Sequence, residues 1–166
     1  PTVAGSIVGT YWFLMMIGRL CGASIGAKVS SRAMLTVVST VGIVLVLGAI
    51  FCADNILVNM PVFKSDISFG FAQVPINVML LILCGLCTSV MWGGIFNLAV
   101  EGLGKYTAAA SGLFMVMVCG GGILPLIQGG VADFAGFLNS YWVIALGLAY
   151  ILFYAAIGSK NVNTDI

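Results

Sequence analysis

Residues 89–133 read SVMWGGIFNLAVEGLGKYTAAASGLFMVMVCGGGILPLIQGGVAD. This stretch is typical of the end of one membrane helix, a short polar turn at 101–107, and a second helix interrupted by the glycines 120–122 and by Pro125. In water an interior glycine costs a helix about 1 kcal/mol and an interior proline about 3 kcal/mol. In a bilayer both are tolerated where neighbouring helices or water satisfy the freed backbone groups. We therefore expect this second helix to pack against other helices.

The composition of the chain is that of an integral membrane protein. Of its 166 residues, 61% are hydrophobic and only 7% are charged, whereas soluble domains carry about 25% charged residues. Apolar runs of about 20 residues recur, and this is the helix length that crosses a hydrocarbon core about 30 Å thick. These features predict an all-α membrane protein embedded in a lipid bilayer.

The apolar runs predict five transmembrane helices. We expect them at residues 4–28, 33–52, 75–103, 108–132 and 139–158. The connection at 54–74 is too polar to span the bilayer, and we interpret it as an extramembrane or re-entrant loop. The first residue is Pro1 and not Met, so we expect a chain cut from something longer.

The positions of the charges predict the orientation of the helices. With five spans, nearly all the basic residues fall on one side: Arg19, Lys28, Arg32, Lys105 and Lys160. Lys64 falls on the other side, which also receives three acidic residues: Asp54, Asp66 and Asp133. Loops rich in Lys and Arg stay in the cytoplasm. We therefore expect a multi-pass plasma membrane protein with a cytoplasmic carboxyl terminus.

Charge and residue types argue against several other functions. The net charge is +1 and the basic residues are scattered singly, which is unlike a nucleic-acid-binding patch or a polybasic lipid-binding run. The chain has no His, the commonest general base and metal ligand. Near Lys105, Ala99 and Tyr106 occupy positions that a phosphate-binding loop reserves for Gly and for Ser or Thr. We expect no enzyme activity, no cofactor and no metal site.

Five cysteines fall in apolar stretches, and two of them, Cys84 and Cys87, form a CxxC pair. The pair has no second CxxC, no His and no βαβ context that would support a zinc or redox site. We interpret the cysteines as small buried residues of membrane helices. Metal or redox chemistry is the alternative interpretation.

The third predicted helix carries a polar face. Ser89, Gly93 and Asn97 lie at i, i+4 and i+8 on one side, and Thr88 and Trp92 form the adjacent stripe. An aromatic ring flanked by hydroxyls and an amide is typical of a sugar-binding surface. Trp92 lies deeper in the helix than the residues of an interfacial aromatic belt, which is the alternative interpretation. We expect Trp92, Ser89, Thr88 and Asn97 to line a substrate cavity.

Glycines recur at intervals of four in the first predicted helix, at Gly18, Gly22 and Gly26. Such spacing lets another helix approach closely. Arg19 lies near one edge of the hydrocarbon layer, where it either snorkels to the interface or turns inward to a carbonyl, a carboxylate or a gate partner. We expect Gly18, Arg19 and Gly22 to act in gating or helix packing.

Several stretches resemble one family of membrane transporters. Residues 11–22, YWFLMMIGRLCG, are similar to the eighth helix of major facilitator transporters of the fucose–galactose–glucose/proton symporter family. Residues 89–98, SVMWGGIFNL, resemble its tenth helix. Residues 102–107, GLGKYT, and 120–133, GGGILPLIQGGVAD, resemble the following loop and the eleventh helix. The stretches keep the order and spacing of the family.

The resemblance implies that the five predicted helices are helices eight to twelve of a major facilitator fold, in a carboxyl-terminal half that lacks helix seven. In this family the tenth helix lines the central cavity, the eighth and eleventh meet the other half, and the ninth and twelfth face lipid. The implied function is proton-coupled symport of a monosaccharide of the fucose, glucose or galactose type by alternating access. The implied partners are the sugar, protons, the bilayer and the missing amino-terminal half, in a bacterial inner membrane.

The resemblance also assigns residues. Trp92 matches a cavity aromatic of the tenth helix. From the breaks in the fourth predicted helix itself, we expect Gly121, Pro125 and Gln128 to act in gating or helix packing. The carboxylates that carry the proton in this family lie in the amino-terminal half.

The chain also departs from the family pattern. Trp92 is followed by Gly93 and Gly94, where the family usually has Pro and Thr, and Glu101 stands where a basic residue is common. Two alternatives therefore stay open beside the sugar symporter. One is a major facilitator transporter of another small solute, and the other is a membrane subunit or scaffold that does not transport.

Overall fold

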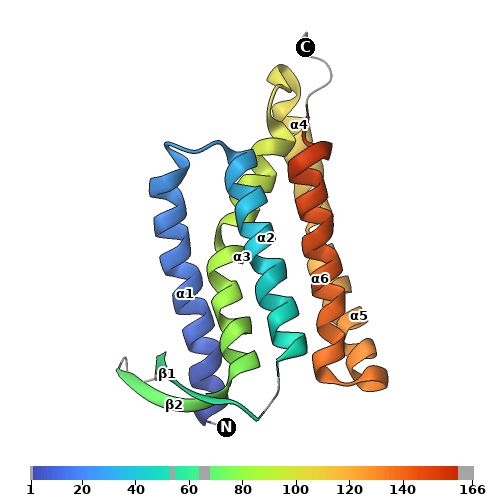
Figure 1. Cartoon of the computed structure of the whole chain (residues 1–166). Coiled ribbons are helices and arrows are strands. Elements are labelled where there is room, and N and C mark those ends of the chain that lie inside the picture. Colours follow the sequence, from blue (N-terminus) through green and yellow to red (C-terminus); the bar gives the residue numbers. More distant parts are fainter. Residues whose placement is uncertain (1, 53–54, 64–67, 161–166) are drawn as a thin grey trace.

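The computed structural model of the chain describes residues 2–52, 55–63 and 68–160. Among these residues, five helical segments are long and apolar enough to cross a membrane (Figure 1). The first three spans are the single helices α1 (Thr2–Gly26), α2 (Ser31–Phe51) and α3 (Ile76–Val100). The fourth span consists of the consecutive elements η1 (Gly104–Tyr106), α4 (Thr107–Met117) and α5 (Gly120–Ala135). The fifth span is α6 (Phe137–Phe153) with its π-helical end η2 (Tyr154–Gly158). The five predicted membrane helices are confirmed.

The helices begin and end where the local sequence favours it. The side chain of Ser30 caps α2 by accepting a hydrogen bond from the backbone N–H of Ala33 at 3.3 Å, as expected for a serine that precedes a helix. Gly136 has φ = 90° and separates α5 from α6. Because side chains disfavour this backbone region, a glycine at that position allows the chain to reverse within one residue.

The fourth span is interrupted earlier than the sequence suggests. The break falls at Val118 and Cys119, where the backbone N–H groups of Gly121 and Gly122 donate to the carbonyls of Val118 and Cys119 at 2.8 and 2.9 Å. These are the tighter i→i+3 bonds typical of helix ends. Pro125 lies inside α5, and the helix continues through it.

The connection predicted as a loop contains a β-hairpin. Strands β1 (Leu57–Phe63) and β2 (Phe69–Pro75) pair antiparallel, from Leu57 opposite Pro75 to Phe63 opposite Phe69. One face of the hairpin is buried against α1 and α3 through Met60, Val62 and Val74. The three charged residues assigned to this connection, Asp54, Lys64 and Asp66, lie outside the described residues.

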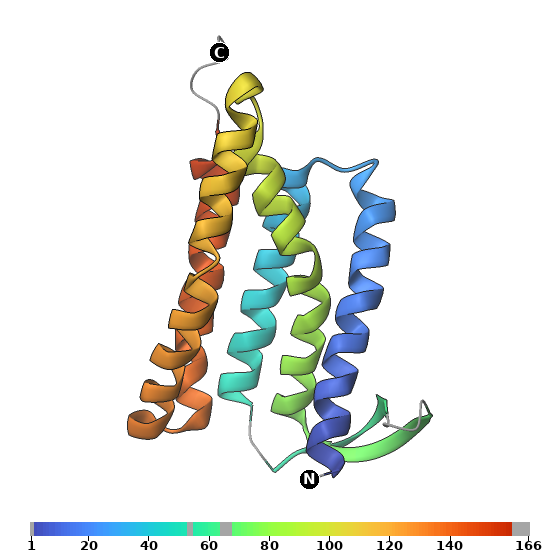
Figure 2. The same cartoon turned by 180° about the vertical axis from the view of Figure 1, so that it is seen from behind.

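The bundle has two layers, which Figures 1 and 2 view from opposite sides. Helices α2 and α6 lie nearest the viewer in Figure 1, and α3 with the α4–α5 segment lies nearest in Figure 2. Helix α1 stands at one flank and packs against α3. The α4–α5 segment contributes no buried residue, so its outward surface is uncovered by the described chain.

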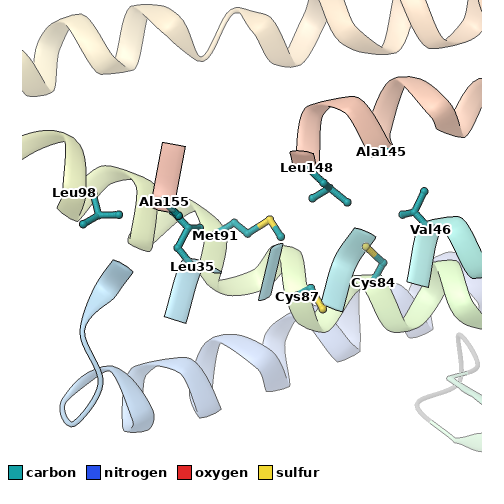
Figure 3. Close-up of a cluster of buried hydrophobic side chains, with 9 residues drawn as sticks. All are labelled: Leu35, Val46, Cys84, Cys87, Met91, Leu98, Ala145, Leu148 and Ala155. Atoms are coloured by element: carbon teal, nitrogen blue, oxygen red, sulfur yellow. The ribbon is translucent and has the colours of Figure 1, made fainter. Parts of the chain in front are cut away.

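The main core lies where α2, α3 and α6 meet (Figure 3). It consists of buried side chains from these helices and from η2: Leu35, Val46, Cys84, Cys87, Met91, Leu98, Ala145, Leu148 and Ala155. Gly42 contributes to the fit, because the position of a Cβ atom there lies 3.4 Å from Leu148 and 3.7 Å from Met91. Helix α2 was expected to face lipid, and it does so on one side only, since its other side forms this core.

Candidate functional site

Helix α3 carries all four residues predicted to bind substrate. It lies between α1 and α2 and also touches α4, so its polar side chains meet different neighbours. Ser89 and Asn97 point toward α1 and the start of α2, Thr88 reaches α1, and Trp92 reaches α4. The predicted group is therefore divided among adjoining surfaces of one helix.

Ser89, Gly93 and Asn97 line a cavity of about 350 Å³ together with Arg19 of α1 and Ser31 of α2. The shared face predicted from their spacing is thus present. The hydroxyl of Ser89 donates to the carbonyl of Leu86 at 2.5 Å, which leaves its oxygen lone pairs as acceptors. Across the cavity, the guanidinium of Arg19 is exposed and lies 3.8 Å from Met15 Sδ.

A second, larger cavity of about 680 Å³ adjoins the first. Its lining comes from the start of α2 and the end of α3: Ser30, Ser31, Arg32, Asn97, Leu98 and Glu101. Arg32 is held by donating to the carbonyl of Ser159 at 2.8 Å, and Asn97 Nδ2 lies 3.5 Å from Ser31 Oγ. Ser31 and Asn97 line both cavities.

The sequence analysis did not include Ser31 or Arg32 in the site. Both follow directly after the helix cap Ser30, at the start of α2. That position is readable from the sequence, because a serine before an apolar run marks a helix start. What the sequence does not give is that the start of α2 lies beside the last turns of α3.

Thr88 belongs to a third cavity, of about 490 Å³, between α1, α3 and the α5–α6 pair. Its Oγ1 atom lies 3.2 Å from the hydroxyl of Tyr11, in hydrogen-bonding distance. Gln128 of α5 and Tyr141 of α6 line the same cavity from the other side. Tyr11 and Tyr141 were not predicted as site residues, and only the fold brings them here.

Trp92 lies on the surface of α3 that faces α4. Its indole is 47% exposed, and its ring centroid lies 5.2 Å from that of Phe114 at an interplanar angle of 62°. Phe96 also contacts Phe114, at 5.4 Å. Such edge-to-face contacts orient aromatic rings, so Trp92 presents a fixed and half-open aromatic surface.

The glycines predicted for packing differ in what they touch. A Cβ atom at Gly18 would collide with Ser89, and one at Gly22 would collide with Val90, so both glycines let α1 approach α3 closely. In contrast, a Cβ atom at Gly121 would meet nothing within 4 Å, and Pro125 is exposed. Packing through Gly121 and Pro125 is therefore not found within the described chain and stays a prediction.

Nothing in the described ranges resembles a metal centre. No group of three or more His, Cys, Asp or Glu side chains that could hold a metal ion occurs in that part of the chain. Cys84 and Cys87 are buried in the core cluster of Figure 3 among apolar side chains. This location agrees with the interpretation of both as small packing residues, whereas Cys21 and Cys119 are exposed in the described chain and not buried as expected.

The chain is similar to sugar transporters of three bacteria. It is 44% identical over 77 residues to a glucose/galactose transporter of Brucella abortus, covering 46% of this chain and 19% of that protein. It is 32% identical over 156 residues to a Helicobacter pylori protein named provisionally as a glucose/galactose transporter. That match covers 91% of this chain and 33% of the Helicobacter pylori protein. It is 32% identical over 93 residues to the L-fucose-proton symporter of Escherichia coli. That match covers 55% of this chain and 21% of the symporter.

These relatives are transporters and not enzymes, and with the five spans they identify a multi-pass membrane protein. The matched regions cover only between 19% and 33% of the length of these relatives. No protein-family model and no solved structure matches the chain.

Proposed function

Since the chain belongs to the fucose–galactose–glucose/proton symporter family, we propose that it forms helices eight to twelve of a monosaccharide transporter. In this proposal α1, α2 and α3 are helices eight, nine and ten, the α4–α5 segment is helix eleven, and α6 is helix twelve. Helix seven and the amino-terminal half belong to the same transporter outside this chain. The transporter works by alternating access, in which two halves rock around one central site.

The two-layer arrangement supports this assignment. The helices that the family places toward the other half and the cavity correspond to α1, α3 and α4–α5, and those it places toward lipid correspond to α2 and α6. Figures 1 and 2 have α2 and α6 on one side and α3 with α4–α5 on the other. The uncovered surface of α4–α5 and its open glycines, such as Gly121, suit contact with a further helix.

The observation that carries the proposal is the half-open indole of Trp92 on α3, the helix whose adjoining surfaces also carry the hydrogen-bonding groups of Ser89, Asn97 and Thr88. A pyranose has an apolar face of C–H groups that stacks on an aromatic ring, and hydroxyls that need donors and acceptors. Trp92 supplies the ring, oriented by Phe114. Ser89 and Asn97 supply polar groups at the cavity toward α1, and Thr88 supplies a hydroxyl at the cavity toward Gln128.

Arg19 is proposed to act in gating near the cytoplasmic end of the substrate path. Its side chain lines the same cavity as Ser89 and Asn97. A cation in that position can pair with a carbonyl or carboxylate of the opposing half when the halves close. Gln128, on the cavity between α3 and α5, is proposed to move with the eleventh helix.

Proton coupling is proposed from the family and from the positions of the acidic residues. In the described chain the two acidic residues, Glu101 and Asp133, are exposed and lie near helix ends. A proton-carrying carboxylate is expected deep in the membrane, and we assign it to the amino-terminal half. The basic residues Arg19, Lys28 and Arg32 gather at one end of the bundle, which supports a cytoplasmic carboxyl terminus.

Uptake by the full-length protein tests the function. Purified transporter in liposomes should take up labelled glucose, galactose or fucose in a saturable manner, faster with an inward proton gradient than without one. Saturable uptake at the same rate with and without the proton gradient would contradict proton coupling but not sugar transport. Absence of saturable uptake of all three sugars, in protein whose folding has been verified, would contradict the sugar assignment.

A further inference from the structure

The depth of the β1–β2 hairpin can be derived from its contacts with α1 and α3. The backbone N–H of Phe63 donates to Thr10 Oγ1 at 2.8 Å, and the Cβ position at Gly9 lies 3.6 Å from the carbonyl oxygen of Phe63. The span of α3 that is long and apolar enough to cross a membrane begins at Ile76, and Ile82 of α3 belongs to the same buried cluster as Met60 and Val62 of β1. The rise from Ile76 to Ile82 is about 9 Å at 1.5 Å per residue. Met60 and Val62 of β1 therefore lie about 9 Å along the helix from this end of the α3 span.

The hairpin is held in place by contacts within the chain. Its buried face packs Met60, Val62 and Val74 against side chains of α1 and α3. At its far end Phe63 stacks on Phe13 of α1, with ring centroids 5.3 Å apart and an interplanar angle of 4°. Phe69 closes this cluster edge-on, 5.6 Å from each of the other two rings. The hairpin thus has a defined outward face.

That outward face is apolar except for two amides. Exposure alternates along both strands, and the exposed side chains are those of Leu57, Asn59, Pro61, Phe69, Phe71 and Gln73. Phe71 is 80% exposed and Phe69 is 65% exposed. Asn59 and Gln73 are cross-strand partners, so the amides lie together. The described residues of the two strands carry no charge.

The free edges of the hairpin carry fewer backbone donors than an ordinary two-stranded sheet. The N–H of Phe63 points to Thr10 and not to β2, and backbone directions alternate with a period of two. Pro61 lies two residues before Phe63 on β1, and Pro75 pairs with Leu57, six residues before Phe63. The backbone nitrogens of both prolines therefore also point away from the partner strand. Because proline has no N–H, each edge loses one donor, and unpaired donors are what makes sheet edges costly near lipid.

From this depth, exposure and edge chemistry we propose that the outward face of the hairpin binds the phospholipid interface. Phe69 and Phe71 enter the boundary between headgroups and acyl chains, and Asn59 and Gln73 bond to headgroups or interfacial water. Amphipathic elements at that boundary lie about 5–10 Å deep, which matches the depth derived from Ile82 of α3. Aromatic side chains favour this layer, whereas bulk water would leave both rings hydrated and the hydrocarbon centre would leave both amides unpaired.

Fluorine NMR of the full-length protein in phosphatidylcholine vesicles tests the proposal. Phe71→4-fluorophenylalanine adds one fluorine to a ring and leaves every other residue in place. Lipids with a nitroxide near the headgroup end of the acyl chain should broaden its signal several-fold more than lipids labelled near the chain end. A gadolinium chelate in the water should broaden it little. The matched control is Phe63→4-fluorophenylalanine, whose ring is packed on Phe13 and should be broadened less by the labelled lipid.

Two results would overturn the proposal. Broadening of the Phe71 signal by the aqueous chelate, without broadening by labelled lipid, would mean that the face points into water. Protection from both reagents would mean that another protein segment or a second copy covers it. The native state of each labelled protein is verified by a Tm equal to that of the unlabelled protein.

Discussion

Gly18 of α1 lies directly against Ser89 of α3. A Cβ atom at Gly18 would stand 2.9 Å from Ser89 Cβ, closer than Cβ atoms approach in folded proteins, and 3.0 Å from the carbonyl oxygen of Leu86, which is a tight contact. No side chain therefore fits between the helices at this level. The contact sets the separation of Arg19 on α1 from Asn97 on α3, which line one cavity.

Gly18→Ala should destabilise the protein. The added methyl group has to push α1 and α3 apart, and overpacking of this kind costs about 1–3 kcal/mol. We expect a lower Tm of the purified protein in detergent. Gly5→Ala in the same helix is the control, because a Cβ atom at Gly5 meets nothing within 4 Å. Equal Tm values for the two variants would contradict the close contact.

Thr10→Val should loosen the hairpin. Valine keeps the shape of threonine but cannot accept the hydrogen bond from Phe63 N–H, and an unpaired buried donor costs about 1–3 kcal/mol. We expect faster hydrogen exchange of the amides in β1 and β2. Thr40→Val is the control, since the Thr40 hydroxyl is exposed and bonds only to the Thr36 carbonyl of its own helix. Unchanged exchange in Thr10→Val would show that side-chain packing holds the hairpin without this hydrogen bond.

Ser39→Ala should leave the stability unchanged or raise it. Ser39 is fully buried in α2, and its hydroxyl has no hydrogen-bond partner in the described chain. Ser140 is equally buried, but its hydroxyl donates to the Phe137 carbonyl at 2.7 Å. Ser140→Ala should therefore lower stability by about 0.5–1.5 kcal/mol. A Tm that falls more for Ser39→Ala than for Ser140→Ala would argue against an unsatisfied hydroxyl.

Arg19→Ala should impair transport by the full-length protein more than Lys28→Ala. Arg19 lines the cavity shared with Ser89 and Asn97, whereas Lys28 follows the end of α1 and does not line it. We expect sugar uptake to fall several-fold for Arg19→Ala and to stay near the original rate for Lys28→Ala. Equal and negligible effects would leave Arg19 as a charge that snorkels to the interface.

Features that depend on helix length and periodicity were predictable from the sequence. Apolar length alone located the five spans, and the i, i+4, i+8 spacing placed Ser89, Gly93 and Asn97 on one face, which the cavity lining confirms. The close approach at Gly18 and Gly22 followed from glycine spacing. All these inferences use only the geometry of a single helix.

Features that depend on the neighbours of a helix were not predictable in the same way. Trp92 and Ser89 are three residues apart, yet one meets Phe114 of α4 and the other meets Gly18 of α1. The hairpin was missed because its polar residues suggested a loop, although Val58, Met60 and Val62 alternate with Asn59 and Pro61 as a strand does.

The position of the break in the fourth span could not be predicted from the sequence, because both the glycines 120–122 and Pro125 can interrupt a helix. Proline removes one N–H and crowds the carbonyl four residues earlier. At Pro125 that residue is Gly121, and the helix continues there. The break falls instead at Val118 and Cys119, just before the glycines 120–122, which give the weakest helix propensity of the span.

The central claim is that Trp92 forms part of the sugar site, and its substitution tests that claim most directly. Sugar affinity should be measured for the full-length protein and for Trp92→Ala and Trp92→Phe, after the folding of each has been verified. Loss of a stacking surface should cost about 1–3 kcal/mol, or roughly ten- to a hundredfold in Kd. We expect that loss for Trp92→Ala and a smaller one for Trp92→Phe, which keeps an aromatic ring beside Phe114. An affinity of Trp92→Ala within about twofold of the original would contradict the claim and leave Trp92 as a packing residue against α4.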